Sequence, residues 1–325
     1  MYNPPFEITS KIIELISNIS EKIGEINYLQ NNPYHIKLRK ENRIKTIHSS
    51  LAIENNSLSL QQITAIIDGK HVLGNPNEIK EVKNSIQAYD LLLTLNPYKE
   101  KDLLNAHRLM MQDLVERNGK YRIDGVGIFD GEKVVHLAPP ADRVPELMFD
   151  LFEWIKTSDV HPLIKSCVFH YEFEFIHPFQ DGNGRIGRLW QTVILKEWKE
   201  IFAWLPVETL IKENQQEYYN VLGASDSAAN STKFIEFMLS LILDTIKEII
   251  ETEKKVTIKV AIKVTINQQK IIDAIKSNPY VTQEELANNI GITKKSIIVN
   301  MKKLQECGLI KRIGANKNGY WQVEE

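Results

Sequence analysis

A run of twelve residues combines side chains that can bind phosphate, hold a metal ion and move a proton. Residues 177–188 read HPFQDGNGRIGR. The two glycines around Asn183 let backbone N–H groups converge at the start of a new helix, which makes an anion-binding nest. Arg185 and Arg188 are three residues apart, so they leave one face of that helix and can clamp anionic oxygens. The run therefore predicts a polyphosphate site.

Two further side chains flank the glycine turn. Asp181 is a hard oxygen ligand suited to Mg²⁺ that bridges phosphates. His177 is a histidine, the residue type that can take a proton from an incoming hydroxyl near neutral pH. Residues 182–187 also match GxGxxG, but no hydrophobic strand precedes them, which argues against a dinucleotide-binding unit. Neither Gly-Lys pair of the chain continues to Ser or Thr, so a P-loop is excluded.

The twelve residues resemble the complete Fic signature, HxFx(D/E)GNGRxxR, and the resemblance extends over roughly residues 10–250. In that family the histidine is the general base, the acidic residue holds Mg²⁺ and the GNG turn binds the phosphates. The first arginine contacts the β/γ end, and the second meets the γ-phosphate or an inhibitory glutamate. Carried over by position, the resemblance implies these site residues: His177, Asp181, Gly182, Asn183, Gly184, Arg185 and Arg188.

The activity that the resemblance implies is protein adenylyl transfer (AMPylation). A nucleotidyltransferase of this kind moves AMP from ATP to a Ser, Thr or Tyr hydroxyl of a protein, with Mg²⁺ as cofactor, and releases pyrophosphate. The turn does not read Ala-Asn-Lys as in the Doc kinases, which favours AMP transfer over phosphate transfer. Two alternatives stay open: a nucleotide-sensing, DNA-binding regulator, and a hydrolase that removes AMP. Intact His177 and Asp181 favour an enzyme over a sensor.

A second motif lies before this core. Ser50, Glu54 and Asn55 resemble the inhibitory motif (S/T)xxxE(G/N) of family members whose inhibitory helix is N-terminal, here at about residues 40–55. A Glu54 carboxylate paired with Arg188 would occupy the guanidinium that should orient the ATP γ-phosphate. The resemblance therefore implies autoinhibition.

Two other segments are candidates for substrate contact. An Asp-Gly step between apolar runs predicts one β-hairpin before a Pro-Pro pair. It resembles the family's flap, which holds the target segment by strand-like pairing, and Val134 and Val135 are the candidate contacts. Packing within the hairpin is the alternative for both valines. Tyr218 and Tyr219 resemble the paired aromatics that line the nucleotide's sugar and base, with a buried helical pair as the alternative.

The periodicity of the apolar residues predicts a mainly α protein: a helical Fic fold with one β-hairpin flap, followed by a small α+β winged-helix domain. The expected divisions are residues 1–95 for the N-terminal helical region, 96–250 for the Fic catalytic core, 251–266 for a linker and 267–325 for the winged helix-turn-helix. Residues 256–266 alternate with period two, which locally indicates a strand, yet no Gly or Pro separates them from the preceding helix. That choice stays open.

The C-terminal stretch resembles a winged helix-turn-helix domain. In such domains the third helix enters the major groove, which would present Lys294, Lys295 and Asn300. Residues 267–325 hold nine Lys and Arg against six Asp and Glu. This small excess leaves two interpretations open, DNA binding through phosphate contacts, and protein contact or dimerisation.

Composition sets the remaining limits. The chain is 43% hydrophobic and 25% charged with a formal net charge of −2, which excludes a disordered chain and a globally basic surface. Its two cysteines support neither a disulfide framework nor a zinc site. We expect no export signal and no membrane partner, and therefore a cytoplasmic protein. The expected partners are ATP and a target protein. The chain itself as a target, and a homodimer, stay open.

Overall fold

The structure is a computed structural model that describes residues 2–29, 34–125, 127–130, 133–306, 308–314 and 319–323. It divides into two compact units. The first comprises Met1–Ile23 and Arg39–Ile246, and the second comprises Gly24–Leu38 and Lys247–Glu325. Each unit is described by itself below.

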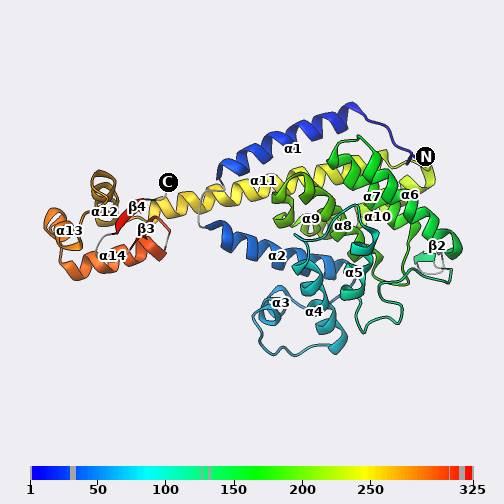
Figure 1. Ribbon diagram of the computed structural model, residues 1–325, viewed down its shortest axis with the longest axis horizontal. Helices are drawn as coiled ribbons and strands as arrows, with labels where there is room; N and C mark the ends of the chain where they lie inside the picture. Colours follow the sequence, from blue (N-terminus) through cyan, green and yellow to red (C-terminus); the bar gives the residue numbers. More distant parts are fainter. Residues whose placement is uncertain are drawn as a thin grey trace. The chain divides into compact units, whose positions relative to one another are not determined.

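Helices account for most of the chain before the C-terminal module (Figure 1), which confirms the mainly α prediction. Their bounds are α1 Ser10–Leu29, α2 Tyr34–Ile53, α3 Leu60–Ile67, α4 Pro76–Asp90, α5 Glu100–Met110, α6 Val144–Thr157, α7 Pro162–Ile176, α8 Asn183–Trp198, α9 Val207–Glu213, α10 Gln215–Ala228 and α11 Thr232–Lys263, with short 3₁₀ turns at Ala141–Arg143 and Glu200–Trp204.

Helix α7 lies at the centre of the first unit. Its side chains are buried at every position from Leu163 to Phe173, so the helix has no polar outer face. A helix that is covered on all sides must be enclosed by other elements, and α7 packs against both α6 and α8. Trp190 of α8 is fully buried and meets Phe152 of α6 edge to face. The turn that joins α7 to α8 is therefore held between two fixed helices.

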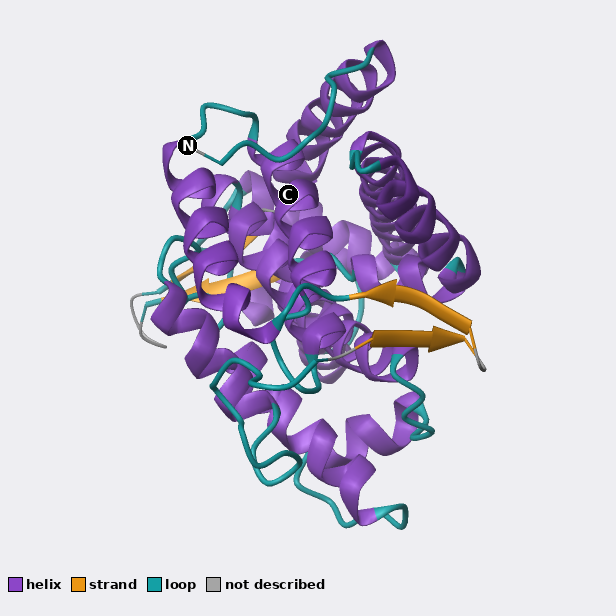
Figure 2. Ribbon diagram, turned by 90° about the vertical axis from the view of Figure 1, so that its right-hand side faces the viewer, coloured by secondary structure: helices purple, strands orange, loops and turns teal. Residues whose placement is uncertain are grey.

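One β-hairpin interrupts the helices of this unit, as the sequence predicts. Strand β1 (Gly127–Asp130) pairs antiparallel with β2 (Lys133–Leu137), and the pair projects from the helical body (Figure 2). Gly127 lies opposite Leu137, and the register of the pairing shifts between Ile128 and Phe129, as at a β-bulge.

The open choice for residues 256–266 is decided in favour of a helix. Helix α11 continues through Lys263, so the strand interpretation is wrong and most of the expected linker is helical. Nothing interrupts the hydrogen-bonding pattern between Thr232 and Lys263, and a helix that is already formed extends at little cost because each added residue gains one bond.

The second unit contains a winged helix-turn-helix, as expected. Its elements are α12 Ile266–Ser277, α13 Gln283–Ile290, α14 Lys294–Glu306, β3 Ile310–Ile313 and β4 Tyr320–Val323. Thr265 and Thr282 begin α12 and α13 with capping boxes. In each, the threonine side chain accepts from the backbone N–H three residues on, and the side chain of that residue accepts from the backbone N–H of the threonine. Ile271, Leu286 and Ile297, one from each helix, are fully buried in a shared core.

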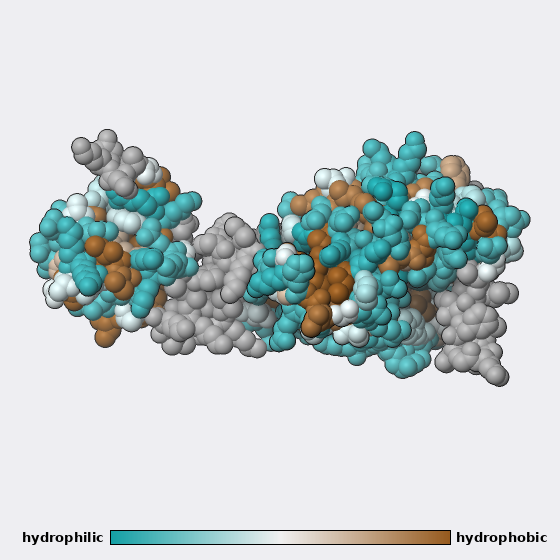
Figure 3. All heavy atoms as spheres, turned by 90° about the horizontal axis from the view of Figure 1, so that it is seen from below, coloured by the Kyte–Doolittle hydropathy of each residue, from teal (hydrophilic) through white to brown (hydrophobic). Residues whose placement is uncertain are grey.

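On the face drawn in Figure 3, hydrophilic residues predominate and hydrophobic side chains interrupt them in limited areas. Among the described residues, no helix combines the length and the apolar character that crossing a membrane requires.

Candidate active site

The turn between α7 and α8 has an unusual backbone at both of its ends. His177 ends α7 in the left-handed conformation (φ 50°, ψ 60°), which costs a non-glycine residue free energy unless the surroundings hold it there. Gly182 precedes α8 with φ 85°, and a Cβ at that position would lie 2.7 Å from Sδ of Met111. Both the conformation and the lack of space require glycine at 182. The predicted sequence of helix end, turn and helix start is confirmed.

Asn183 fastens the turn from inside. Its side chain accepts a hydrogen bond from the backbone N–H of Phe179 at 2.8 Å and donates to the carbonyl of Phe179 at 2.9 Å. The residue is buried, so its side-chain amide is committed to the loop. What Asn183 can offer a phosphate is its backbone N–H, and no side chain caps that end of α8.

His107 of α5 holds the same turn from the other side. Its Nδ1 accepts from the N–H of Gly119 at 2.8 Å, so its Nε2 carries the proton and donates to the carbonyl of Asp181 at 3.0 Å. The ring stacks on Phe179 with centroids 3.6 Å apart. Burial lowers the pKa of His107 to about 4, so the imidazole is neutral. His107 is not among the site residues that the sequence predicted.

Asp181 presents an exposed carboxylate beside the turn. Its Oδ1 accepts from the N–H of Gly182 at 2.5 Å and from Nη2 of Arg185 at 3.1 Å. The described residues contain no group of three or more His, Cys, Asp or Glu that could hold a metal ion alone. Mg²⁺ is commonly bound by one or two carboxylates together with substrate phosphates, and Asp181, with its side chain 58% exposed, fits that arrangement.

Arg185 is buried but incompletely bonded. Besides its contact with Asp181, its Nη1 lies 3.5 Å from Oε1 of Glu81 on α4. Within the described part of the chain, neither Nε nor Nη1 has a hydrogen-bond partner, although both atoms are buried. Buried N–H groups without acceptors are costly, and anionic oxygens would satisfy them. The guanidinium is therefore suited to an anion that enters the turn.

Arg188 is bound by the segment that the sequence marked as inhibitory. Its Nη2 lies 2.7 Å from Oε1 of Glu54 and donates to the carbonyl of Ser50 at 3.0 Å, and its Nε donates to Oγ of Ser50 at 3.3 Å. The Arg188 side chain is 2% exposed, against 31% for Glu54. Burial by itself lowers the pKa of Arg188, but the Glu54 carboxylate outweighs it and holds that pKa above the usual value.

Glu54 is held in place by the way α2 ends. Asn55 has φ 66°, and its N–H bonds to the carbonyl of Ala52 at 3.2 Å, while the N–H of Asn56 bonds to the carbonyl of Leu51 at 3.1 Å. These two bonds and the left-handed residue make a Schellman cap. The left-handed position favours Gly or Asn, which is a physical reason for Asn directly after Glu54.

The Glu54 carboxylate also lies against the glycine turn. A Cβ on Gly184 would lie 2.5 Å from Oε1 of Glu54 and 3.0 Å from Nη1 of Arg188. Four residues that span almost 140 positions of the sequence thus meet at one place: Ser50, Glu54, Gly184 and Arg188. A carboxylate occupies the position where the turn could receive an anion.

Comparison with known proteins agrees with this geometry. The sequence profile of the Fic/DOC family matches residues 97–195, and that of a winged helix-turn-helix DNA-binding domain matches residues 265–311. The crystal structure of a Fic family protein from Desulfovibrio desulfuricans G20 is 44% identical, with a TM-score of 0.76, and the match covers 99% of this chain and 98% of that one. The chain belongs to the Fic family.

More distant Fic relatives carry a functional name. Protein adenylyltransferase fic-1 of Caenorhabditis elegans is 26% identical over 226 residues, which is 66% of this chain and 42% of that protein. Protein adenylyltransferase Fic of Nematostella vectensis is 25% identical over 242 residues, 69% of this chain and 53% of that protein. The chain thus spans about half the length of these curated relatives or less. A Fic domain protein from Bacteroides thetaiotaomicron, 19% identical with a TM-score of 0.62, covers 76% of this chain and shows the fold alone.

The two tyrosines of α10 differ in exposure. Tyr218 is 2% exposed, and its hydroxyl is 3.0 Å from Nε2 of His170, whose Nδ1 meets Gln191 at 2.7 Å. Tyr219 is 46% exposed, and its pKa is raised by burial and then by the charge of Glu54. Tyr219 is therefore accessible to a nucleotide on the Glu54 side of the Fic site, whereas Tyr218 lines the interior in this structure.

The flap candidates are only partly described. Val134 and Val135 lie on β2, opposite β1, so their backbone belongs to the hairpin. Their side chains lie outside the described part of the structure, and their role stays a prediction.

Behind Arg188 lies a carboxylate that the sequence analysis did not single out. Glu208 of α9 is 2% exposed, and its Oε1 accepts from the hydroxyl of Tyr89 at 3.3 Å. Burial raises its pKa to about 7, against an opposing effect of the Arg188 charge. A single Glu in a helical stretch gives no signal of this burial, because burial depends on what packs against α9.

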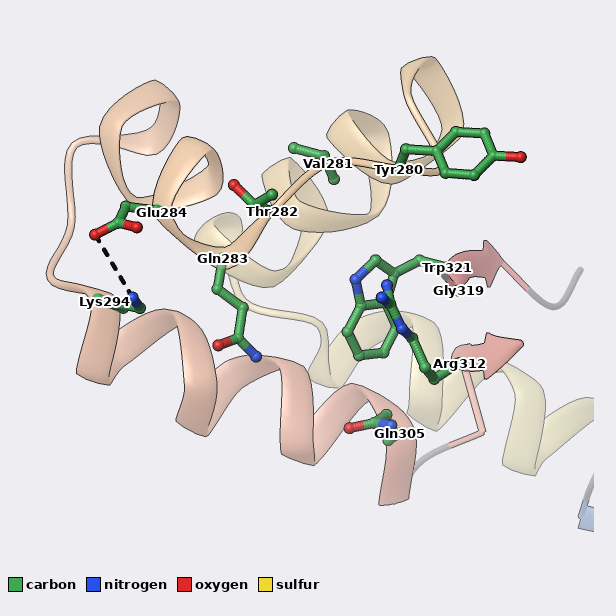
Figure 4. A pocket seen from close by; sticks show the side chains of 10 residues that line it. All are labelled: Tyr280, Val281, Thr282, Gln283, Glu284, Lys294, Gln305, Arg312, Gly319 and Trp321. Atoms are coloured by element: carbon green, nitrogen blue, oxygen red, sulfur yellow. Dashed lines mark ion pairs between the residues drawn. The ribbon is translucent and has the colours of Figure 1, made fainter. Parts of the chain in front are cut away.

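The winged helix presents the predicted residues in different ways. Lys294 and Lys295 at the start of α14 are exposed, and Lys294 lies 3.5 Å from Glu284 of α13 (Figure 4). Asn300 donates to the carbonyl of Ser296 at 2.8 Å, within its own helix. A hollow lies between the start of α13, α14 and the β3–β4 hairpin, and Figure 4 shows Arg312 over the ring of Trp321 at its edge.

Proposed function

We propose that this chain is a self-inhibited protein adenylyltransferase, which transfers AMP from ATP to a Ser, Thr or Tyr hydroxyl of a protein. The observation that carries the proposal is the position of the Glu54 carboxylate, against Gly184 and 2.7 Å from Nη2 of Arg188. A site that attracts a carboxylate in this way, with the unbonded N–H groups of Arg185 close by in sequence, is suited to a polyphosphate.

In the proposed reaction His177 takes the proton from the acceptor hydroxyl as its oxygen attacks the α-phosphorus of ATP. One O–P bond forms to the acceptor and the bond to the bridging oxygen breaks, so pyrophosphate leaves with its electron pair. The N–H groups at the start of α8 and the guanidiniums of Arg185 and Arg188 hold the triphosphate in line. Mg²⁺ held by Asp181 would neutralise charge on the phosphates.

The proposed inhibition follows from competition for one guanidinium. While Glu54 pairs with Arg188, the γ-phosphate of ATP has no access to that side chain, and the added negative charge repels it. ATP would then bind without its γ-phosphate fixed, and the α-phosphorus would not face the hydroxyl. Loss of alignment by about 1 Å costs roughly 10²-fold in rate. Release of Glu54 is therefore the activating event.

The test uses ATP labelled separately at the α- and γ-phosphates, with Mg²⁺, on the wild type, Glu54→Gly and Glu54→Gly/His177→Ala. We expect label on protein from the α position only, raised about tenfold or more in the single variant and absent in the double variant. Label from the γ position would make the protein a kinase and overturn the proposal. No label with any variant would favour a nucleotide sensor or AMP removal, which a pre-AMPylated protein substrate would reveal.

The winged helix is proposed as a binding module with no part in the chemistry. Exposed Lys294 and Lys295 suit DNA phosphates, whereas the exposed Ile298 and Val299 of the same helix suit a protein surface. Binding to random-sequence duplex DNA that weakens steeply between 50 and 200 mM salt, and weakens further in Lys294→Ala/Lys295→Ala, would identify DNA. Concentration-dependent mass with no DNA binding would identify a protein partner, the chain itself included.

We also propose a reducing compartment, the cytoplasm, as the place of this activity. Cys167 of α7 is a free, fully buried thiol, and burial raises its pKa to about 12. Free cysteines are typical of reducing compartments. Fractionation of the native cell, followed by immunoblotting, tests the assignment.

A further inference from the structure

One buried guanidinium joins the base of the hairpin to the turn that carries His177. Arg122 lies just before β1 and is 3% exposed. Its Nε donates to the carbonyl of His177 at 2.7 Å, and its Nη2 donates to the carbonyl of Ile176 at 3.3 Å. The backbone N–H of Arg122 bonds to the carbonyl of Pro178 at 2.9 Å. Arg122 thus contacts three successive residues around the left-handed position.

The same side chain also binds the backbone at both ends of the hairpin. Nη1 of Arg122 donates to the carbonyl of Asp124, where the chain enters β1, and the distance is 2.9 Å. Nη2 donates to the carbonyl of Pro139, where the chain leaves β2, at 2.5 Å. Within the described part of the chain no carboxylate forms an ion pair with Arg122, and the side chain bonds there to backbone carbonyls alone. Because the guanidinium is planar and its N–H groups point in fixed directions, it fixes the positions of these carbonyls relative to one another.

We infer that Arg122 is a positioning residue that fixes the hairpin relative to His177. The inference rests on the proposed function, in which His177 takes the proton of the acceptor hydroxyl, and on the role expected of the hairpin from its resemblance to the flap that holds the target segment. His177 keeps its left-handed backbone only if its surroundings over-determine it, and Arg122 bonds the carbonyls of His177 and of the residue before it. A two-stranded ribbon is marginally stable alone, so the hairpin depends on contacts outside its own strands.

The nucleotide side of the site does not depend on these bonds. Arg188 is held by α2, and Asn183 closes the turn through Phe179. Loss of the hydrogen bonds of the Arg122 guanidinium should therefore loosen the hairpin and misplace the acceptor hydroxyl, while the affinity for ATP stays the same. A general loss of structure would lower both together, which separates positioning from support of the fold.

The experiment compares Arg122→Lys with Arg117→Lys, both in the Glu54→Gly background. Arg117 is a matched control because it lies in the same loop and is half-buried. Among the described residues it donates only to the carbonyl of Tyr121, at 3.4 Å. Three quantities are measured on the full chain: amide hydrogen exchange of residues 127–137 and of His177 without nucleotide, the equilibrium affinity for ATP, and label transferred to the chain itself from α-labelled ATP.

For Arg122→Lys we expect at least about tenfold faster exchange in the hairpin and at His177, and an unchanged ATP affinity. We also expect self-labelling lowered about 10- to 100-fold, the size of a 1 Å misplacement. Arg117→Lys should leave all three unchanged. Equal exchange in the two variants, or parallel loss of ATP affinity and labelling, would overturn the inference.

Failure of the proposed function has a different signature. It would appear as absence of label in the parent Glu54→Gly protein, and the exchange measurement would still decide whether Arg122 joins the hairpin to the turn. If Arg122→Lys does not fold, the wild type provides the answer. Its hairpin amides and the His177 amide should then respond in parallel to low concentrations of urea, and independent responses would contradict the inference.

Discussion

Oε1 of Glu54 lies 2.5 Å from the point that a Cβ on Gly184 would occupy. The carboxylate therefore touches the backbone of the turn as well as Nη2 of Arg188, 134 positions later in the chain. The inhibitory contact, as we propose it, excludes an anion both from the arginine and from the first turn of α8. Glu54 is 31% exposed at this place, so a competing phosphate can approach it from solvent.

Gly184→Ala should destabilise the wild type by about 1–3 kcal/mol, because the added methyl group overlaps a carboxylate that is bound to a buried arginine. In a Glu54→Gly background most of that cost should disappear, since the closest overlapping atom is gone. Urea unfolding of the four proteins measures the coupling. Gly223→Ala is the control: that glycine lies in α10 with open space around it, and alanine should stabilise the helix slightly. An equal loss of stability in both backgrounds would show that the added methyl group does not clash with Glu54.

Arg185→Lys should lower ATP affinity about tenfold or more in the Glu54→Gly background. The buried guanidinium offers two unbonded N–H directions, and a lysine ammonium cannot reproduce that planar fork. Isothermal titration with ATP and with AMP separates the polyphosphate contribution from that of the nucleoside. Arg143→Lys, an exposed arginine paired with Glu146, should change neither affinity. An equal loss for ATP and AMP would show that Arg185 does not act on the β/γ end.

Glu208 predicts a stability that falls as pH rises through the weakly acidic range. Its pKa is about 7 in the folded protein and 4.5 ordinarily, so between these values the folded state keeps a proton that the unfolded chain has released. Folding is then favoured at the lower pH, and the loss between pH 4.5 and 7 is on the order of 3 kcal/mol at most. Glu208→Gln should remove this part of the pH dependence.

Urea unfolding at pH 5 and pH 8 tests that prediction. The quantity compared is the change in the free energy of unfolding between the two pH values, in the wild type and in Glu208→Gln. The comparison is needed because burial also raises the pKa of Glu172 to about 7, so other groups titrate in the same window. Glu213→Gln, at an exposed position of the same helix, is the control and should keep the wild-type slope. An unchanged slope in Glu208→Gln would show that Glu208 is ionised in the folded protein at both pH values.

His107→Ala should destabilise the protein by about 2–4 kcal/mol, because it removes a buried ring and leaves the N–H of Gly119 without its acceptor. The native pKa of about 4 lies below the ordinary 6.5, so the unfolded chain takes up a proton first and stability falls as pH drops from 6.5 towards 4. The variant should lack this fall. Replacement of the exposed His71 by alanine should retain it, and equal acid profiles for wild type and His107→Ala would contradict the assignment.

The local properties of the sequence determined the turn that carries the chemistry. The Gly residues on either side of Asn183, the histidine before them and the arginines after them specify a helix end, a left-handed turn and a new helix start, and all three are present. Such features depend on residues a few positions apart, so propensity and spacing suffice to predict them. The period-two run at 256–266 shows the limit, because a helix that precedes it without a break continued through Lys263.

Only the tertiary structure decided which distant groups meet. The sequence suggested that Glu54 faces Arg188, and the fold brings Glu54, directly after α2, to 2.7 Å from Arg188 of α8. It gave no sign that Arg122 binds five carbonyls with its side chain and backbone, or that Tyr218 turns inward to His170 while Tyr219 stays exposed. Neighbouring residues of one helix differ in this way because burial depends on which elements pack against each side. The packing of helices depends on residues throughout the chain, whereas the chemistry of the turn depends on twelve consecutive residues.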